Sequence, residues 1–356
     1  MPGPRRPIEL RDYAEPDLPP GSALLRTAYS EVCGTDVHLH HGRLDDVVYP
    51  FIPGHVAVGV LEKIRGEVRD VEGRALAEGT PVTFLDVHRT CHACWACLVG
   101  RASTRCPHRK VYGITYGLAD GLTGGWSEKI ALKPGTRILP LSESAFERFM
   151  AGGCSLPTAL HALERAEVRI ADTVLVLGAG PVGLSSVILS RLSGAARVLA
   201  IGAPTHRLET AREVGATGVL DFRHSVSERL DWVRSHTGGR GAAVTVEATG
   251  SPDAVAEAMR FTRDGGRVVV AGQYTDGGET SINPHRDLNR KHLEVRGCWG
   301  SDYSHFHRGA VLMEDPVLSA PWTRVPVRRY GLGEVSEALR RVASGEAVKA
   351  LIDPAR

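Results

Sequence analysis

Residues Thr173–Gly183 read Thr-Val-Leu-Val-Leu-Gly-Ala-Gly-Pro-Val-Gly, and this stretch decides the fold of the second half of the chain. The apolar run Thr173–Leu177 has no period-two alternation, which is typical of a strand buried on both faces. Three glycines follow in the spacing G-x-G-x-x-G, and a helical pattern begins directly after them. The stretch therefore predicts a strand, a tight turn and a helix in that order.

Apolar runs and helical patterns continue to alternate on the C-terminal side of this stretch. Further strands are expected at 197–203, 218–222, 243–250 and 267–273, and helices at 181–194, 206–216, 226–238 and 253–265. Such alternation predicts an α/β domain with a doubly wound parallel sheet. Before about residue 155 the apolar runs are short and broken by Gly and Pro, which is typical of a β-rich unit. After about residue 298 the pattern is mixed, so we expect a nucleotide-binding domain inserted into a β-rich domain.

Length and composition exclude several classes of protein. The 356 residues predict about two domains, and a net charge of +2 gives no general attraction to nucleic acid or anionic lipid. No apolar stretch is long enough to span a membrane, and the first residues lack a secretory pattern, so we expect a soluble cytoplasmic protein. Seven cysteines, four of them crowded between Cys91 and Cys106, argue against a secreted disulfide framework.

The glycine pattern predicts a site for a dinucleotide. Gly178 permits the tight turn, Gly180 lets the backbone approach a pyrophosphate, and Gly183 lets helix and strand pack closely. Pro181 and Val182 open the helix, whose N-terminus favours an anion. The alternative is a doubly wound domain whose glycines serve packing alone.

The second strand of this domain lacks the acidic residue that usually holds the adenosine ribose. The strand ends in Gly202, which is followed by Ala203. Arg207 lies five residues after Gly202. Without that acid a 2′-phosphate is not repelled, so NADP is possible as well as NAD. Arg207 can equally stack on adenine, and we lean slightly to NAD.

The crowded cysteines have the spacing of a metal site. Cys91, Cys94, Cys97 and Cys106 place four thiols within sixteen positions. Four thiolate ligands suit a closed tetrahedral zinc with a structural role. The alternative is a set of reduced or redox-active thiols.

The remaining candidate ligands are scattered, and each alone is more often a core residue than a ligand. Together, however, they form five motifs that follow one another along the chain: Cys33-Gly-Thr-Asp-x-His38, Pro53-Gly-His55, the four-cysteine loop, Cys154-x3-Thr158 and the glycine turn. In this the chain resembles the zinc-dependent medium-chain alcohol dehydrogenases from about residue 20 to its end.

That resemblance implies a division of the chain into two domains. A GroES-like β-rich catalytic domain is implied at 1–155, with a zinc lobe at about 88–110, and a Rossmann NAD(P)-binding domain at 156–298. Residues 299–356 would return to the catalytic domain. The resemblance also implies a catalytic zinc held by Cys33, His55 and Cys154, with water or a substrate oxygen in the fourth position.

The resemblance suggests roles for further residues. Thr35 would take the proton of the alcohol and His38 would relay it to the surface, while Asp36 would hydrogen-bond the ligand histidine. Contacts to the coenzyme are implied for a set at the strand ends and near the C-terminus: Thr249, Gly250, Ala271, Gly272, Cys298, Trp299 and Lys349. Family members commonly form homodimers or homotetramers, and no partner besides a small alcohol or carbonyl compound is expected.

Two positions depart from the family pattern. Val56 stands where a glutamate commonly follows the ligand histidine, and the last gap of the cysteine loop has eight residues instead of seven. Cys33, His55 and Cys154 together argue against a zinc-independent reductase of the same superfamily, but Val56 leaves room for that alternative. A second alternative is a catalytically silent structural or regulatory homologue that keeps the fold and the structural zinc.

A mixed polar and aromatic set is expected to line the substrate pocket. Its members are His41, Asp45, Asp46, Tyr49, Phe51, Tyr112, Tyr116, Trp126 and Trp299. Such a lining favours a functionalised secondary alcohol, such as a polyol, a sugar derivative or a cyclic alcohol, over ethanol.

Overall fold

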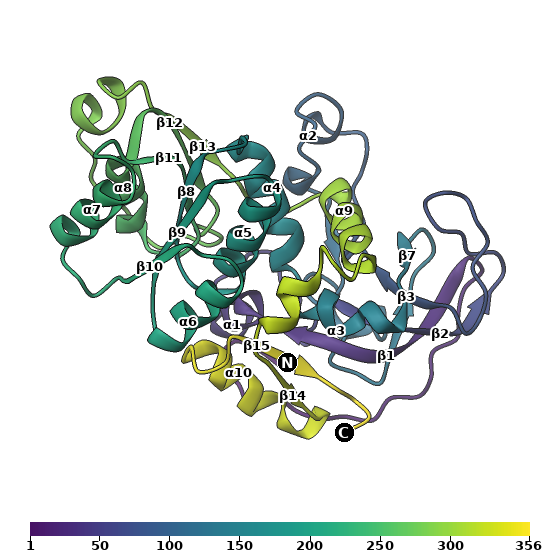
Figure 1. The fold of residues 1–356 in the computed structure, drawn as a ribbon. Coiled ribbons are helices and arrows are strands. Elements are labelled where there is room, and N and C mark those ends of the chain that lie inside the picture. Colours follow the sequence, from purple (N-terminus) through teal and green to yellow (C-terminus); the bar gives the residue numbers. More distant parts are fainter. The chain divides into compact units, whose positions relative to one another are not determined.

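The structure is a computed structural model that describes all 356 residues, and these divide into two compact units (Figure 1). Unit 1 comprises Met1–Cys154, Asp302–Pro316 and Pro326–Arg356, and unit 2 comprises Ser155–Ser301 and Val317–Val325. The chain therefore leaves unit 1 and returns to it, and a short segment near the C-terminus groups with unit 2. None of the helices combines the length and apolar character needed to cross a membrane.

Unit 2 is built on a six-stranded parallel sheet in the order β10-β9-β8-β11-β12-β13. Its strands are β8 (Thr173–Leu177), β9 (Arg197–Gly202), β10 (Gly218–Asp221), β11 (Ala242–Glu247), β12 (Thr262–Val270) and β13 (Glu294–Gly297). This is the strand order of doubly wound dinucleotide-binding sheets, with the order reversing beside the first strand. The expected parallel sheet is confirmed.

Helices cover both faces of this sheet. They are α4 (Ser155–Ala166), α5 (Pro181–Leu192), α6 (Thr205–Glu213), α7 (Val226–Ser235) and α8 (Pro252–Phe261), with short helical segments η3 (Pro284–Asn289) and η4 (Ala320–Arg324). α4, α5 and α6 pack on one face, and α7 and α8 pack on the other (Figure 1). The central strands are buried on both faces, which explains their continuous apolar sequences.

Unit 1 is built on a seven-stranded sheet in the order β14-β15-β1-β2-β3-β7, with β6 also paired to β1. Its strands are β1 (Ser22–Val32), β2 (Ala57–Arg65), β3 (Pro81–Phe84), β6 (Lys129–Leu132), β7 (Ile138–Pro140), β14 (Val327–Tyr330) and β15 (Lys349–Ile352), and β4 (Val87–Arg89) and β5 (Lys110–Val111) form a separate pair. The C-terminal strand β15 lies antiparallel beside β1 (Figure 1). Two strands that are more than 300 residues apart in the sequence therefore lie side by side in one sheet.

Unit 1 also contains five α-helices, which are 4 to 12 residues long. They are α1 (Gly34–His41), α2 (Trp95–Leu98), α3 (Glu143–Gly152), α9 (Tyr303–Glu314) and α10 (Val335–Ala343), with single turns η1 (Ser103–Arg105), η2 (Leu118–Asp120) and η5 (Leu332–Glu334). α3 packs against α9, and α10 packs against α1 and β15. The expected β-rich character of this part of the chain is confirmed.

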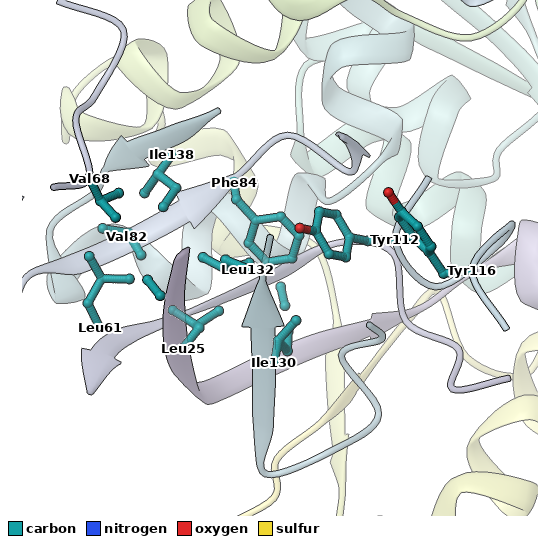
Figure 2. Packing of buried hydrophobic residues seen from close by; sticks show 12 residues of the cluster. Leu25, Leu61, Val68, Val82, Phe84, Tyr112, Tyr116, Ile130, Leu132 and Ile138 are labelled. Atoms are coloured by element: carbon teal, nitrogen blue, oxygen red, sulfur yellow. The ribbon is translucent and has the colours of Figure 1, made fainter. Parts of the chain in front are cut away.

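A hydrophobic cluster beneath this sheet corrects two of the expected pocket residues. The Tyr112 ring packs edge-on against Phe84, and the Tyr116 ring packs against Tyr112 (Figure 2). The Tyr112 ring is completely buried, and its hydroxyl is hydrogen-bonded to Thr136 (2.6 Å). Both tyrosines belong to the core of unit 1, and two more of the expected pocket residues, Phe51 and Trp126, are likewise buried, in a second hydrophobic cluster of this unit.

Candidate metal centre and coenzyme site

Cys33 lies at the junction between β1 and α1, where extended backbone turns into a helix. Its sulfur accepts a hydrogen bond from the Thr35 N–H (3.3 Å), and the Asp36 carboxylate accepts one from the Cys33 N–H (2.9 Å). This reciprocal capping fixes the backbone on both sides of the thiol. The start of the helix therefore holds the Cys33 sulfur in one orientation.

His55 and Cys154 meet Cys33 within unit 1. The ligand atoms of the three residues all lie within 4.8 Å of one another, and Cys33 Sγ is 3.8 Å from His55 Nε2. His55 lies two residues before the start of β2, and Cys154 follows the C-terminus of α3. Gly54, before His55, has φ +89° and lies against Trp126, so a side chain at this position would be strained and would collide.

The donor set fits a zinc ion. Two thiols and one imidazole are a known combination at catalytic zinc sites, where they leave a fourth position open. Cys33 and His55 are buried, and His55 Nδ1 and Asp36 Oδ1 are buried atoms that have no hydrogen-bond partner. The expected hydrogen bond between Asp36 and His55 is therefore not formed, although the two groups are close enough to interact electrostatically.

Electrostatic effects at this cluster favour a thiolate. Burial raises the pKa of the Cys33 thiol, but hydrogen bonding with Cys154 and the charge on His55 outweigh it and hold that pKa well below its usual value. Burial, with help from the Cys33 charge, raises the pKa of Asp36 well above the usual range of a carboxyl group. A thiolate is the form in which cysteine binds metals.

A buried ion pair that the sequence did not suggest lies beside this cluster. The Lys349 ammonium contacts the Glu31 carboxylate, and the two side chains are 1% and 0% exposed. The prediction that Lys349 reaches a pyrophosphate is wrong, because its ammonium group is enclosed in unit 1 and also donates to the Gly152 carbonyl (3.2 Å). The only signal available in the sequence was a glutamate near the end of a strand, two residues before the candidate ligand Cys33.

The two residues expected to move a proton lie on α1. Thr35 and His38 are three residues apart on this helix and are both half-buried, so they lie on neighbouring positions of one face. Burial, and then the charge of Arg43, lowers the pKa of His38. The His38 ring is therefore neutral near pH 7 and able to accept a proton.

The four remaining clustered cysteines converge in a lobe between β4 and β5. The sulfurs of Cys91, Cys94, Cys97 and Cys106 lie within 4.8 Å of one another. Cys106 Sγ is 3.6 Å from Cys91 Sγ and accepts a hydrogen bond from the Cys91 N–H (3.3 Å). Hydrogen bonding by the Ala93 N–H is the main cause that lowers the pKa of Cys91 to about 6. The arrangement fits a tetrahedral zinc site.

The glycine turn of unit 2 has the open geometry that a dinucleotide needs. Gly178 has φ +110°, and a side chain at Gly183 would collide with the Gly178 carbonyl. At Gly180, which caps α5, an added Cβ would meet no atom within 4 Å, so the backbone faces free space there. The N-terminus of α5, with Pro181 in its first turn, is thus accessible to an anion.

The end of β9 has no room for the acidic residue that usually binds the adenosine ribose at this position. A Cβ at Gly202 would lie 2.8 Å from the Ala179 Cβ and from the Ala179 nitrogen, so the strand end presses against the glycine turn. Ala203 follows, and Arg207 lies half-buried in α6, where burial lowers its pKa. No carboxylate ends this strand.

Glu247, which the sequence did not single out either, holds the ends of β11 and β12 together by hydrogen bonds. Its buried carboxylate accepts hydrogen bonds from the Thr249 N–H and hydroxyl (2.6 Å each) and from the Gly250 and Gly272 N–H groups (3.2 Å each). The predicted coenzyme residues Thr249, Ala271 and Gly272 therefore lie together at the carboxyl edge of the sheet of unit 2, where ligands of such sheets bind.

Comparisons with known proteins agree with both units. A model of the alcohol dehydrogenase GroES-like domain matches residues 19–143, and a model of zinc-binding dehydrogenases matches residues 181–314. The chain is 32% identical to the 5-exo-hydroxycamphor dehydrogenase of Pseudomonas putida over 346 residues, which cover 95% of this chain and 93% of that protein.

Solved structures give the same result. The crystal structure of an alcohol dehydrogenase from Thermotoga maritima has a TM-score of 0.90 at 33% identity and covers 98% of this chain and 96% of its own. A protein described as a zinc-binding dehydrogenase from Sinorhizobium meliloti 1021, bound to NADP, has a TM-score of 0.81 at 25% identity, with coverage of 97% and 95%. The fold is a GroES-like β-rich domain joined to a Rossmann domain, and the chain belongs to the zinc-binding alcohol dehydrogenase family of oxidoreductases.

Proposed function

We propose that this chain interconverts a secondary alcohol and its carbonyl product, using NAD(P) and a catalytic zinc held by Cys33, His55 and Cys154. The observation that carries the proposal is the convergence of these three ligand atoms, from three distant segments, within 4.8 Å in unit 1. A structure that needed only a coenzyme for alkene reduction would have no use for this donor set. Unit 1 is then the catalytic domain and unit 2 the coenzyme domain.

In the proposed reaction, the zinc and the coenzyme supply Lewis-acid and hydride-transfer chemistry, and the side chains of the protein transfer the proton. When bound, zinc acts as a Lewis acid on the alcohol oxygen while the nicotinamide accepts a hydride from the alcohol carbon. The Thr35 hydroxyl would accept the proton that the alcohol loses while it donates its own proton onward, and His38, neutral at pH 7, would accept that proton and carry it outward. Cys33 is fixed by its capping hydrogen bonds, so little reorganisation is needed at the metal.

The coenzyme proposal includes both nucleotides, with NAD slightly preferred. The carboxyl end of β9 has no acid to bind the ribose hydroxyls and none to repel a 2′-phosphate. Arg207 lies near this strand end, and its side chain can stack on adenine or pair with a phosphate. Titration with NADH and with NADPH separates the two coenzymes.

The four-cysteine lobe is proposed to hold a second, structural zinc. All seven cysteines are free thiols, which suits a reducing compartment such as the cytoplasm. As the family resemblance implies, the protein is proposed to be a homodimer or homotetramer.

For the substrate we propose a functionalised secondary alcohol, with cyclic alcohols first. The support is the relative named for 5-exo-hydroxycamphor, a cyclic alcohol. The pocket lining expected from the sequence supports it less, because four of its members, Tyr112, Tyr116, Phe51 and Trp126, are core residues. The test is steady-state oxidation of a panel of cyclic alcohols, polyols and primary alcohols with each coenzyme. We expect cyclic secondary alcohols to give the highest kcat/KM, whereas a higher value for ethanol than for all the others would contradict the proposal.

A further inference from the structure

We infer that the buried Glu31–Lys349 pair positions Cys154 as the third metal ligand, an inference that rests on the catalytic zinc proposed above. Glu31 is the residue before the last of β1 and Lys349 is the first of β15, so the antiparallel pairing of these strands brings the two residues close together. Both residues act through Cys154 and neither is proposed to touch the substrate.

The Glu31 carboxylate contacts both the backbone nitrogen and the sulfur of Cys154. One carboxylate oxygen accepts a hydrogen bond from the Cys154 N–H (2.7 Å), and the other lies 3.5 Å from the Cys154 sulfur and contacts the Lys349 ammonium. A carboxylate so placed fixes both the backbone and the thiol of this residue. Metal ligands are commonly oriented in this way by hydrogen-bonded neighbours.

Lys349 provides the charge that makes this arrangement possible. The Glu31 carboxylate is completely buried beside a ligand thiol, and without a cation two negative groups would face each other in a site closed to water. The ammonium group balances the carboxylate, and its hydrogen bond to the Gly152 carbonyl (3.2 Å) ties it to the end of α3. The pair therefore adds no net charge to the metal site.

Gly153 shows how closely the pair fits against this segment. It has φ +52°, and a side chain there would collide with both the Glu31 carboxylate and the Lys349 ammonium. The backbone that leads into Cys154 thus rests directly on the ion pair. A disturbance of either charge moves the segment that carries the ligand.

The test measures zinc release from the full-length holoprotein. Wild type, Lys349→Met, Glu31→Gln and the double variant are mixed with excess chelator, and the two zincs per chain are followed separately in time, with the four-cysteine site as internal reference. Absorption spectra of the Co²⁺-substituted proteins report the geometry of the site that contains Cys154. Glu257→Gln, which breaks the partly buried Arg229–Glu257 pair of unit 2, is the matched control.

We expect Lys349→Met and Glu31→Gln to release one zinc about 10-fold faster or more, with altered cobalt bands and unchanged release from the other site. The double variant, which restores neutrality, should release zinc more slowly than Lys349→Met. If Lys349→Met does not fold, Glu31→Gln alone decides by the same measurements.

Two results would overturn the inference. In the first, the Glu31 and Lys349 variants have a lower melting temperature but release zinc at the wild-type rate and have wild-type cobalt spectra. In the second, Glu257→Gln releases zinc as fast as the Glu31 and Lys349 variants do. A wild-type protein that holds a single zinc would instead refute the proposed catalytic site, so the two failures are distinguishable.

Discussion

At the residue scale, Cys33 combines two roles, because its sulfur caps α1 and also belongs to the three-residue metal cluster. Replacing the sulfur by oxygen keeps a capping atom but removes the thiolate. The fold should therefore survive a change that removes the metal.

Cys33→Ser should lose one zinc per chain, keep the other, and lower kcat/KM by about 10³-fold, which corresponds to about 4 kcal/mol of transition-state stabilisation. Metal analysis and steady-state alcohol oxidation measure both effects. The control for metal content alone is Cys298→Ser, which should keep both zincs, because Cys298 is buried in unit 2 outside both cysteine clusters. Wild-type turnover in Cys33→Ser would refute the assignment.

His38 gives a prediction for the dependence on pH. Burial lowers its pKa below 6.5, so a base at this position is neutral above that pKa and is protonated as the pH falls through it. The kcat/KM of wild type for alcohol oxidation should therefore fall on the acid side with a limb below pH 6.5. In His38→Gln this limb should disappear and the plateau should be lower. A profile with the same limb in both proteins would contradict the relay role.

The ligand residues followed from sequence motifs, whereas their surroundings did not. Cys33, His55 and Cys154 were named because the family motifs occur in order, and the structure brings them together. Glu31 and Lys349 are 318 positions apart, and their pairing arises only when β15 joins β1. A lysine near the C-terminus therefore gave no sign that it would be buried.

At the element scale, the glycine turn between β8 and α5 allows two substitutions with different consequences. An added methyl at Gly180 would meet no protein atom, whereas one at Gly183 would collide with the Gly178 carbonyl. The two positions thus separate the coenzyme role of the turn from its packing role.

Gly180→Ala should leave the melting temperature unchanged and weaken NADH binding by about 10-fold, because its methyl group enters the space left for the pyrophosphate. Gly183→Ala should also lower stability by about 1–3 kcal/mol through overpacking. Thermal unfolding and fluorescence titration with NADH measure the two effects. Equal loss of stability in both variants would contradict this division of roles.

The cysteine lobe between β4 and β5 depends on its metal, because it has little regular structure of its own. Cys106→Ser removes one of four ligands, and we expect loss of the structural zinc and rapid proteolysis within residues 91–106. Limited proteolysis followed by mass spectrometry locates the cleavage. Cys154→Ser is the control, since it should lose the other zinc and keep the lobe resistant. Protease resistance of Cys106→Ser equal to wild type would argue against a structural zinc.

The elements of unit 2 could be predicted more fully than those of unit 1. Continuous apolar strands such as Thr173–Leu177 alternate with helices, so periodicity alone located them. In unit 1 the strands are short, and partners such as β1 and β15 are distant in sequence. The aromatic residues Tyr112 and Tyr116 illustrate the difficulty, because the sequence does not show which face of a loop packs into the core.

At the scale of the whole molecule, the chain pairs a β-rich unit that carries both metal clusters with a parallel-sheet unit that carries the glycine turn. Each unit keeps its candidate site within its own residues. Metal binding and coenzyme binding can therefore be measured as separate properties of one protein.

The proposed catalytic zinc is tested most directly by the zinc content of the purified protein, combined with titration by NADH and NADPH before and after chelation. We predict two zincs and one coenzyme site per chain, with coenzyme binding retained and alcohol oxidation lost when the zinc at Cys33, His55 and Cys154 is removed. A single zinc per chain, with coenzyme bound and alcohol oxidised at the full rate, would contradict the account.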